Sequence, residues 1–157
     1  LPYFDVTGPP EFVEDASGVI AGLKMGTTRG EILKAILEGE TFYFRAGLEA
    51  LRELGINTTE FVATGGGARS DRWLQIKADI FGVPFVRPKF TEGSLLGAAI
   101  LAGVSTGALA TVDEGVRRFV ARDRVFEPAP ERQAVYRERY EKYRPLFPLL
   151  RDYLKTL

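Results

Sequence analysis

The stretch from Thr64 to Gly82 holds the residues whose types and spacing could bind a ligand. An apolar run at 61–63 is followed by three glycines, Gly65 to Gly67, and by an amphipathic segment that starts near Ser70. Glycine can adopt positive φ and lets a ligand approach the main chain closely. The N–H groups and the dipole at the start of the next helix favour an anion. The pattern predicts a phosphate or nucleotide site on a strand, glycine turn and helix, although a turn without a ligand would have the same residues.

Two common nucleotide-binding patterns do not fit these glycines. Walker A is excluded because no Gly-Lys-Ser/Thr follows the turn. Gly65 and Gly67 fit the first two places of Gly-x-Gly-x-x-Gly, but position 70 is Ser, and no clear acid ends the next strand where a ribose partner would lie. A dinucleotide-dependent oxidoreductase is therefore a weaker hypothesis, which preferential binding of NAD over ATP would support.

The composition excludes several kinds of chemistry. The 157 residues include no Cys and no His, which removes a thiol nucleophile, a disulfide framework, a His-ligated metal and a Ser-His-Asp triad. Basic and acidic residues number 21 each, so no nucleic-acid or membrane-surface partner is expected. With no apolar stretch long enough to span a bilayer and no visible signal peptide, we expect a cytoplasmic protein. Because the first residue is Leu1, the chain could be a processed piece or a fragment.

The segments before the turn are expected to form a loop, a strand and a long helix. Residues 1–17, with three prolines, predict an irregular loop. An apolar run between glycines predicts a strand over 18–26. A capping box of Thr28 and Glu31 starts a helix whose apolar residues keep helical spacing until Gly55 ends it.

Three glycines within helices are expected to mark close packing. Gly39 and Gly47 lie inside the long helix, where each costs about 1 kcal/mol relative to Ala, so we expect another backbone to pack against them. Gly97 lies in a helix expected over 91–103, which is apolar on all sides and should therefore be buried. Glu92 stands at the start of that helix, where the dipole favours a carboxylate.

The remaining elements complete an alternation of strands and helices. Ser70 or Asp71 is expected to cap a helix that ends at Gly82. Further elements are a strand over 84–88, placed toward a sheet edge by its prolines, and helices over 112–120 and 131–143. Pro145 and Pro148 are expected to break the second of these helices before a last helical piece that ends at Leu157. Tyrosines along one stripe of the helix at 131–143 predict a docking face. Alternation of this kind is typical of α/β layering.

Taken together, these residues resemble the C-terminal portion of the FGGY carbohydrate kinases, a family that includes glycerol kinase, xylulokinase and related ketose kinases. The resemblance covers nearly the whole chain. Its most specific part is Gly65-Gly-Gly-Ala-Arg-Ser70, followed by Trp73 and the run 75–79. Three further pieces agree in order, namely Thr27-Thr-Arg29, Leu37-Glu-Gly39 and Leu96-Gly-Ala-Ala99.

The resemblance implies an α/β, actin-like ATPase (ribonuclease H-like) fold of two domains with ATP in the cleft between them. Residues 1–127 would form most of the second domain, and 128–157 a C-terminal helical extension that packs on it. The N-terminal kinase domain would be absent from this chain. Family members often carry a polar run and Trp-Asp-Pro after the opening residues, which this chain lacks, so the sugar is left open.

The resemblance also implies the site residues. By match, Gly65, Gly66, Gly67 and Ala68 would shape the nucleotide side of the cleft and meet the adenosine or the α-phosphate. Asp71 falls where glycerol kinase has an Asn close to the purine and ribose.

The implied activity is transfer of the γ-phosphoryl of Mg-ATP to a hydroxyl of a ketose or polyol. The family's catalytic Asp and both phosphate loops have no match here, so we expect no catalytic residue and no metal ligand in this chain, which would be inactive alone. Mg²⁺ would be held mainly by the absent domain and the phosphates. We expect a homo-oligomer, a dimer being favoured, and a piece made alone would be dimeric or poorly soluble because a fragment leaves a sheet edge unpaired. A non-catalytic nucleotide-sensing or scaffold protein on the same fold is the alternative.

Overall fold

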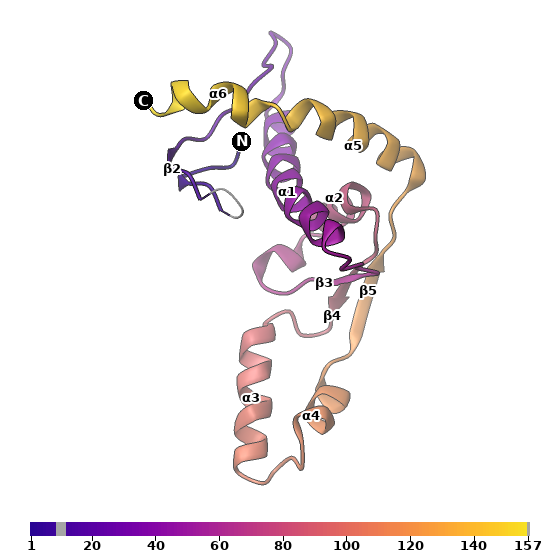
Figure 1. Ribbon diagram of the computed structural model, residues 1–157. Helices are drawn as coiled ribbons and strands as arrows, with labels where there is room; N and C mark the ends of the chain where they lie inside the picture. The colour runs from indigo at the N-terminus through magenta and orange to yellow at the C-terminus, as the bar shows by residue number, and fades with distance from the viewer. Residues whose placement is uncertain (9–11, 157) are drawn as a thin grey trace. The chain divides into compact units, whose positions relative to one another are not determined.

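The computed structural model describes residues 1–8 and 12–156, with the backbone alone at Asp15 (Figure 1). Predictions for residues 9–11 and 157 lie outside this description. The chain divides into two compact units. The first unit comprises residues 1–57, 79–81 and 129–157, and the second unit comprises 58–78 and 82–128. Across the described ranges, none of the helices combines the length and the apolar composition needed to cross a bilayer.

The first unit opens with two short paired strands. β1 (Asp5–Val6) pairs antiparallel with β2 (Glu14–Ala16), so the prediction of an irregular loop there was wrong in part. The strand predicted over 18–26 is not formed, and Leu23 and Met25 are exposed. An apolar run becomes a strand only where a neighbouring strand pairs with its main-chain N–H and C=O groups. β1 and β2 pair with each other, and neither pairs with residues 18–26.

The long helix forms as predicted. α1 extends over Arg29–Glu53. The Glu31 N–H donates to Thr28 Oγ1 at 3.3 Å, while the Thr28 N–H donates to Glu31 Oε2 at 2.8 Å. This is the expected capping box. The chain leaves the helix at Gly55, where φ is +80°.

Two C-terminal helices belong to the first unit. α5 covers Pro130–Tyr143 and α6 covers Leu146–Leu154. Tyr136 and Tyr140 of α5 are buried, and their ring centroids lie 6.2 and 5.7 Å from that of Phe42 on α1. The predicted tyrosine docking face is therefore confirmed.

The second unit contains a three-stranded sheet in the order β3–β4–β5 (Figure 1). β3 (Phe61–Val62) pairs parallel with β4 (Phe85–Pro88), and β4 pairs antiparallel with β5 (Arg122–Phe126). β4 is thus central, and its predicted place at an edge was wrong. Pro84 precedes the strand and Pro88 ends it, so neither ring interrupts the middle of the ladder. β5 was not predicted.

α2 (Asp71–Phe81) follows the glycine turn with the predicted bounds. Leu74 and Ala78 on this helix have no exposed surface. The helix ends at Gly82, which is in the left-handed region with φ +71°. Both ends of α2 therefore lie where the residue types placed them.

α3 (Gly93–Ser105) and α4 (Val112–Phe119) lie side by side in the second unit (Figure 1). α3 was expected to be buried because it is apolar on all sides, but Leu95 and Leu101 are mostly exposed and Ile100 is its one buried residue among those described. Burial of an apolar helix needs partners on every side, and the described part of the chain does not supply them.

The close packing predicted at three glycines was also wrong. No atom of residues 1–8 and 12–156 beyond the neighbouring backbone lies within 4 Å of an ideal Cβ on Gly39, Gly47 or Gly97. Close approach occurs at other glycines. A Cβ on Gly115 of α4, for example, would lie 2.6 Å from a methyl group of Ile100. Sequence position within a helix does not reveal which glycine faces a neighbour.

Candidate functional site

The predicted glycine turn lies between β3 and α2. Gly65 has φ +76°, in the left-handed region that favours glycine. A short 3₁₀ helix, η1 (Gly66–Arg69), follows it. A Cβ on Gly67 would lie 2.8 Å from the ring of Trp73 on α2. The backbone conformation therefore requires glycine at position 65, and packing requires it at position 67.

The other two predicted contact residues differ in their access to a ligand. Gly66 is exposed, and nothing in the described residues lies within 4 Å of the place where its Cβ would be. Ala68 is 1% exposed, so its side chain is buried. A ligand at this turn can thus approach the main chain at Gly66, whereas Ala68 can offer only main-chain atoms.

The start of α2 adds the electrostatic preference for an anion. Ser70 is the N-cap residue, and its Oγ accepts the Trp73 N–H at 3.3 Å. Asp71 is the first helical residue, so the cap is Ser70 and not Asp71. The first N–H groups of a helix have no partner within it, and its dipole places partial positive charge there. The turn and the helix start together fit an anionic group such as a phosphate.

The Asp71 side chain is held by arginines of the sheet. Its Oδ1 accepts from Arg87 Nη1 of β4 and its Oδ2 from Arg124 Nη1 of β5, both at 2.5 Å. Arg87 Nε also donates to Asp123 Oδ2 at 2.9 Å. The hydrogen bonds to Asp71 and Asp123 raise the pKa of the Arg87 guanidinium above its usual value. We call these four side chains the Asp71 cluster.

Sequence reasoning placed Asp71 near the site but missed the other three members of the Asp71 cluster. The available signal was the run Arg122-Asp-Arg124 directly before Val125 and Phe126. Charged residues beside β-branched and aromatic ones are compatible with a half-exposed strand. Which of these charges would face Asp71 depends on the pairing of β4 with β5, which lies outside any local pattern.

The turn is also joined to the start of α3. The Gly65 N–H donates to the Thr91 carbonyl at 2.6 Å. Arg69 Nη2 lies 2.7 Å from Glu92 Oε1, and both side chains are largely exposed. Exposed ion pairs contribute only about 0–1 kcal/mol, so the main-chain contact is the firmer connection.

Two pockets lie away from this turn. A pocket of about 280 Å³ in the first unit is lined in part by Tyr43, Tyr140 and Tyr143. Another of about 330 Å³ lies between α3 and α4 and is lined mainly by apolar side chains. Neither is lined by a residue of the turn. Within residues 1–8 and 12–156, no group of three or more acids is arranged to hold a metal ion.

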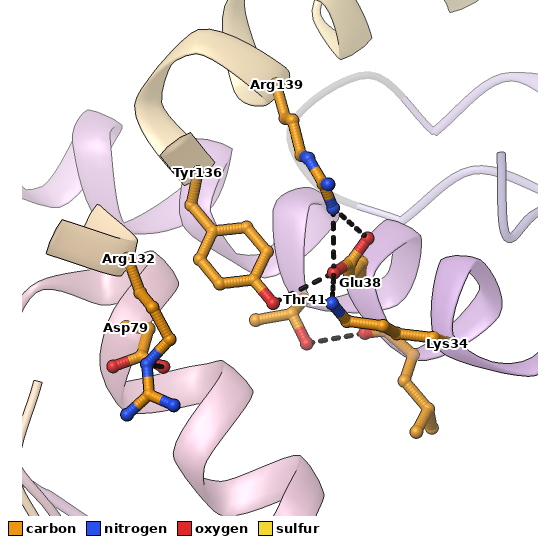
Figure 2. Close-up of polar contacts among 8 residues, drawn as sticks. Lys34, Glu38, Thr41, Asp79, Arg132, Tyr136 and Arg139 are labelled. Atoms are coloured by element: carbon orange, nitrogen blue, oxygen red, sulfur yellow. Dashed lines mark hydrogen bonds and ion pairs between the residues drawn. The ribbon is translucent and has the colours of Figure 1, made fainter. Parts of the chain in front are cut away.

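The most buried acids among the side chains that the structure describes, Glu38 and Asp79, serve the packing of α5 instead. Figure 2 shows Glu38 of α1, which is 7% exposed, accepting hydrogen bonds from Tyr136 Oη at 2.8 Å and Arg139 Nη1 at 3.2 Å. Lys34 Nζ lies 3.3 Å from the same carboxylate. Burial, followed by the bond to Glu38, raises the pKa of the Tyr136 hydroxyl well above its ordinary value.

Asp79, which is 2% exposed, binds groups at the start of α5. Its Oδ1 accepts the Ala129 N–H at 2.9 Å, and its Oδ2 lies 2.9 Å from Arg132 Nε (Figure 2 draws Asp79 beside Arg132). Both carboxylates are bound by donors of α5 or of its N-cap residue, and these contacts hold α5 in place.

Comparison with known proteins agrees with this fold. The family described as "FGGY family of carbohydrate kinases, C-terminal domain" matches residues 1–106. A xylulose kinase of Staphylococcus epidermidis is 33% identical over 146 residues, covering 93% of this chain and 29% of that protein. A glycerol kinase of Ralstonia nicotianae is 39% identical over 133 residues, covering 84% of this chain and 26% of that protein.

A solved structure shows the same similarity. The ligand-bound xylulose kinase from Lactobacillus acidophilus superposes with a TM-score of 0.77 at 28% sequence identity, covering 90% of this chain and 29% of that one. This chain therefore spans less than a third of the length of the proteins it matches.

Proposed function

The chain belongs to the FGGY family of carbohydrate kinases, and we propose that it is the C-terminal, nucleotide-binding part of an ATP-dependent sugar kinase. The complete enzyme would transfer the γ-phosphoryl of ATP to a hydroxyl of a ketose or polyol. The observation that carries this proposal is the glycine turn, with main chain open to a ligand at Gly66 and the start of an eleven-residue helix beside it.

Within this part, the nucleotide would meet the main chain of Gly65, Gly66 and Gly67. Ala68 would contribute main-chain atoms only, and Asp71 would lie at the margin of the site. ATP supplies the phosphoryl group, and these residues bind and orient it. Because the Asp71 carboxylate is paired with two arginines, it adds no unbalanced negative charge beside a phosphate.

The remaining parts of the active site would come from outside this chain. Phosphoryl transfer depends on positioning, on a metal ion and on a residue that orients the acceptor. We propose that an N-terminal domain supplies the catalytic acid and, with the phosphates, holds Mg²⁺. Residues 1–127 would then form most of the second domain of an actin-like, ribonuclease H-like pair, and 128–157 its helical extension.

The family membership also supports two broader proposals. Kinases of sugar metabolism work where ATP and free sugars are present, so we propose a cytoplasmic location. We further propose a homo-oligomer, with a dimer favoured. Light scattering on the complete protein tests the second point, and a monodisperse monomer would contradict it.

The test of function is ADP release by the complete gene product with Mg-ATP and a panel of pentuloses, hexuloses, glycerol and other polyols. Stimulation by one acceptor is the expected result, and it would also identify the sugar. A protein that binds ATP but responds to no acceptor would overturn the kinase proposal and favour a nucleotide-sensing scaffold on the same fold.

A further inference from the structure

The Asp71 carboxylate lies beside the proposed nucleotide turn, yet both of its oxygens are bound by arginines. We infer that Asp71 is a positioning residue, which holds the glycine turn through Arg87 and Arg124 and makes no contact with the nucleotide base. This inference rests on the proposed function and assigns a part to one residue of that site.

The two arginines are themselves held in place. Arg87 is only 18% exposed, and its second partner is Asp123 of β5. The Arg124 guanidinium carbon lies 4.8 Å from the centroid of the Phe126 ring, within the range of a cation–π contact. Asp71 therefore binds two groups whose positions are set by the sheet.

The place of Asp71 in the chain makes this attachment relevant to the turn. Asp71 is the first residue of α2, and only Ser70 separates it from η1. Holding the Asp71 carboxylate against β4 and β5 thus fixes the direction in which η1 enters the helix. A one-residue separation leaves little freedom for the glycines to move independently, so a change at Asp71 reaches the main chain of Gly66.

The charges of the Asp71 cluster are consistent with this part. It contains two carboxylates and two guanidiniums, so its formal charge is zero. An unpaired carboxylate at the start of α2 would repel a phosphate bound at the turn. Pairing with arginines removes that repulsion and leaves both Asp71 oxygens occupied, so recognition of the base falls to main-chain atoms.

A double-mutant cycle on the complete enzyme tests the inference. The variants are Asp71→Asn, Arg124→Gln and both together, with KM for ATP, KM for the sugar, Kd for ATP and the ratio of kcat/KM for ATP over GTP as readouts. Asp71→Asn is expected to raise the ATP constants about three- to tenfold and to leave the sugar KM and the ATP-to-GTP ratio within twofold. Combining it with Arg124→Gln should raise the ATP constants by clearly less than the product of the single effects.

Asp113→Asn is the matched control. Asp113 is also an exposed aspartate in the first turn of a helix, but that helix is α4, and Asp113 does not belong to the Asp71 cluster. We expect its ATP constants to stay within twofold of wild type. Thermal midpoints of all variants separate loss of folding from loss of positioning.

Three results would overturn the inference. These are multiplicative effects in the double variant, a shift of the ATP-to-GTP ratio above threefold in Asp71→Asn, or an equal effect of Asp113→Asn. Failure of the proposed function can be told apart from failure of this inference. If the wild-type protein binds ATP but phosphorylates no acceptor, the kinase proposal fails, and the double-mutant cycle is still measured through the Kd for ATP. A wild-type protein that binds no ATP would overturn both.

Discussion

Acidic side chains are used in opposite ways in the two units. Glu38 and Asp79 of the first unit are buried and accept hydrogen bonds from tyrosine, arginine and main-chain donors. Asp71 and Glu92 of the second unit are about half exposed and pair with arginines beside an open glycine turn. Removing a partner from a buried pair costs about 3–5 kcal/mol, whereas exposed pairs contribute about 0–1 kcal/mol. The acids of the first unit therefore contribute mainly to the stability of the fold, and those of the second unit mainly to the position of the glycine turn.

The largest predicted effect lies in the first unit. Glu38→Ala leaves the buried Tyr136 hydroxyl without its acceptor and releases Arg139, and we expect a loss of about 3 kcal/mol in the free energy of unfolding by denaturant titration. Glu138→Ala is the control, because Glu138 pairs with Lys142 where both are largely exposed. Little or no change in the free energy of unfolding is expected there, because water screens an exposed ion pair. Equal losses of unfolding free energy in the two variants would contradict the proposed difference between buried and exposed acids.

The second prediction separates packing from ligand contact at the turn. Gly67→Val forces a Cβ to within 2.8 Å of the Trp73 ring, so it should lower the thermal midpoint and raise the ATP KM of the complete enzyme about tenfold, with the sugar KM little changed. Equal effects on the two Michaelis constants would count against a nucleotide site.

Gly66→Ala tests ligand contact at the turn without a change in packing. Its Cβ meets no described atom within 4 Å, and Gly66 does not have positive φ, so the thermal midpoint should not fall. The methyl group would occupy the space proposed for the nucleotide, and we expect the ATP KM to rise severalfold. An unchanged ATP KM would mean that the ligand does not lie over Gly66.

The third prediction concerns pH in the first unit. Burial and bonds to Glu38 and Glu49 raise the pKa of the Tyr136 and Tyr140 hydroxyls above their ordinary value. The unfolded chain ionises these groups near pH 10, while the folded chain keeps them neutral. The resulting stability is present below about pH 10 and is lost as the pH rises toward the folded values. The double variant Tyr136→Phe/Tyr140→Phe should flatten this fall in denaturation midpoints measured between pH 9 and 11, and an unchanged slope would contradict it.

The smallest effect is expected at the exposed pair of the second unit. Arg69→Ala removes the ion pair with Glu92 but leaves the main-chain bond from Gly65 to Thr91. We expect less than about 0.5 kcal/mol of lost stability and an ATP KM within twofold of wild type. A larger change in the ATP KM would show that Arg69 itself takes part in nucleotide binding.

Much of the local structure was predictable from residue types. The capping box at Thr28 and Glu31, the N-cap at Ser70 and the glycine that ends α2 each depend on groups within four residues of one another. Such groups meet whenever the helix forms, whatever the rest of the chain does. The glycine turn, with Gly65 in its left-handed conformation, belongs to the same class.

The pairing of strands and the burial of helices were not predictable in this way. β4 was expected at an edge because of its prolines, yet it is central because β5, which is rich in charged residues, pairs with it. α3 was expected to be buried because of its composition, yet most of its apolar side chains are exposed. In each case the outcome depends on which distant segment is present to pack, and composition alone carries no information about that.

The sequence alone determined the turn, the helix that follows it and the family resemblance, because these rest on short spacings and on backbone preferences of glycine, serine and proline. Only the tertiary structure decided what the Asp71 carboxylate does. Its partners Arg87 and Arg124 are 16 and 53 residues away in the chain, and they reach it because the sheet places β4 and β5 beside the start of α2. The charge state and the freedom of that carboxylate follow from this pairing, since electrostatic interaction depends on distance in space and not on distance in sequence.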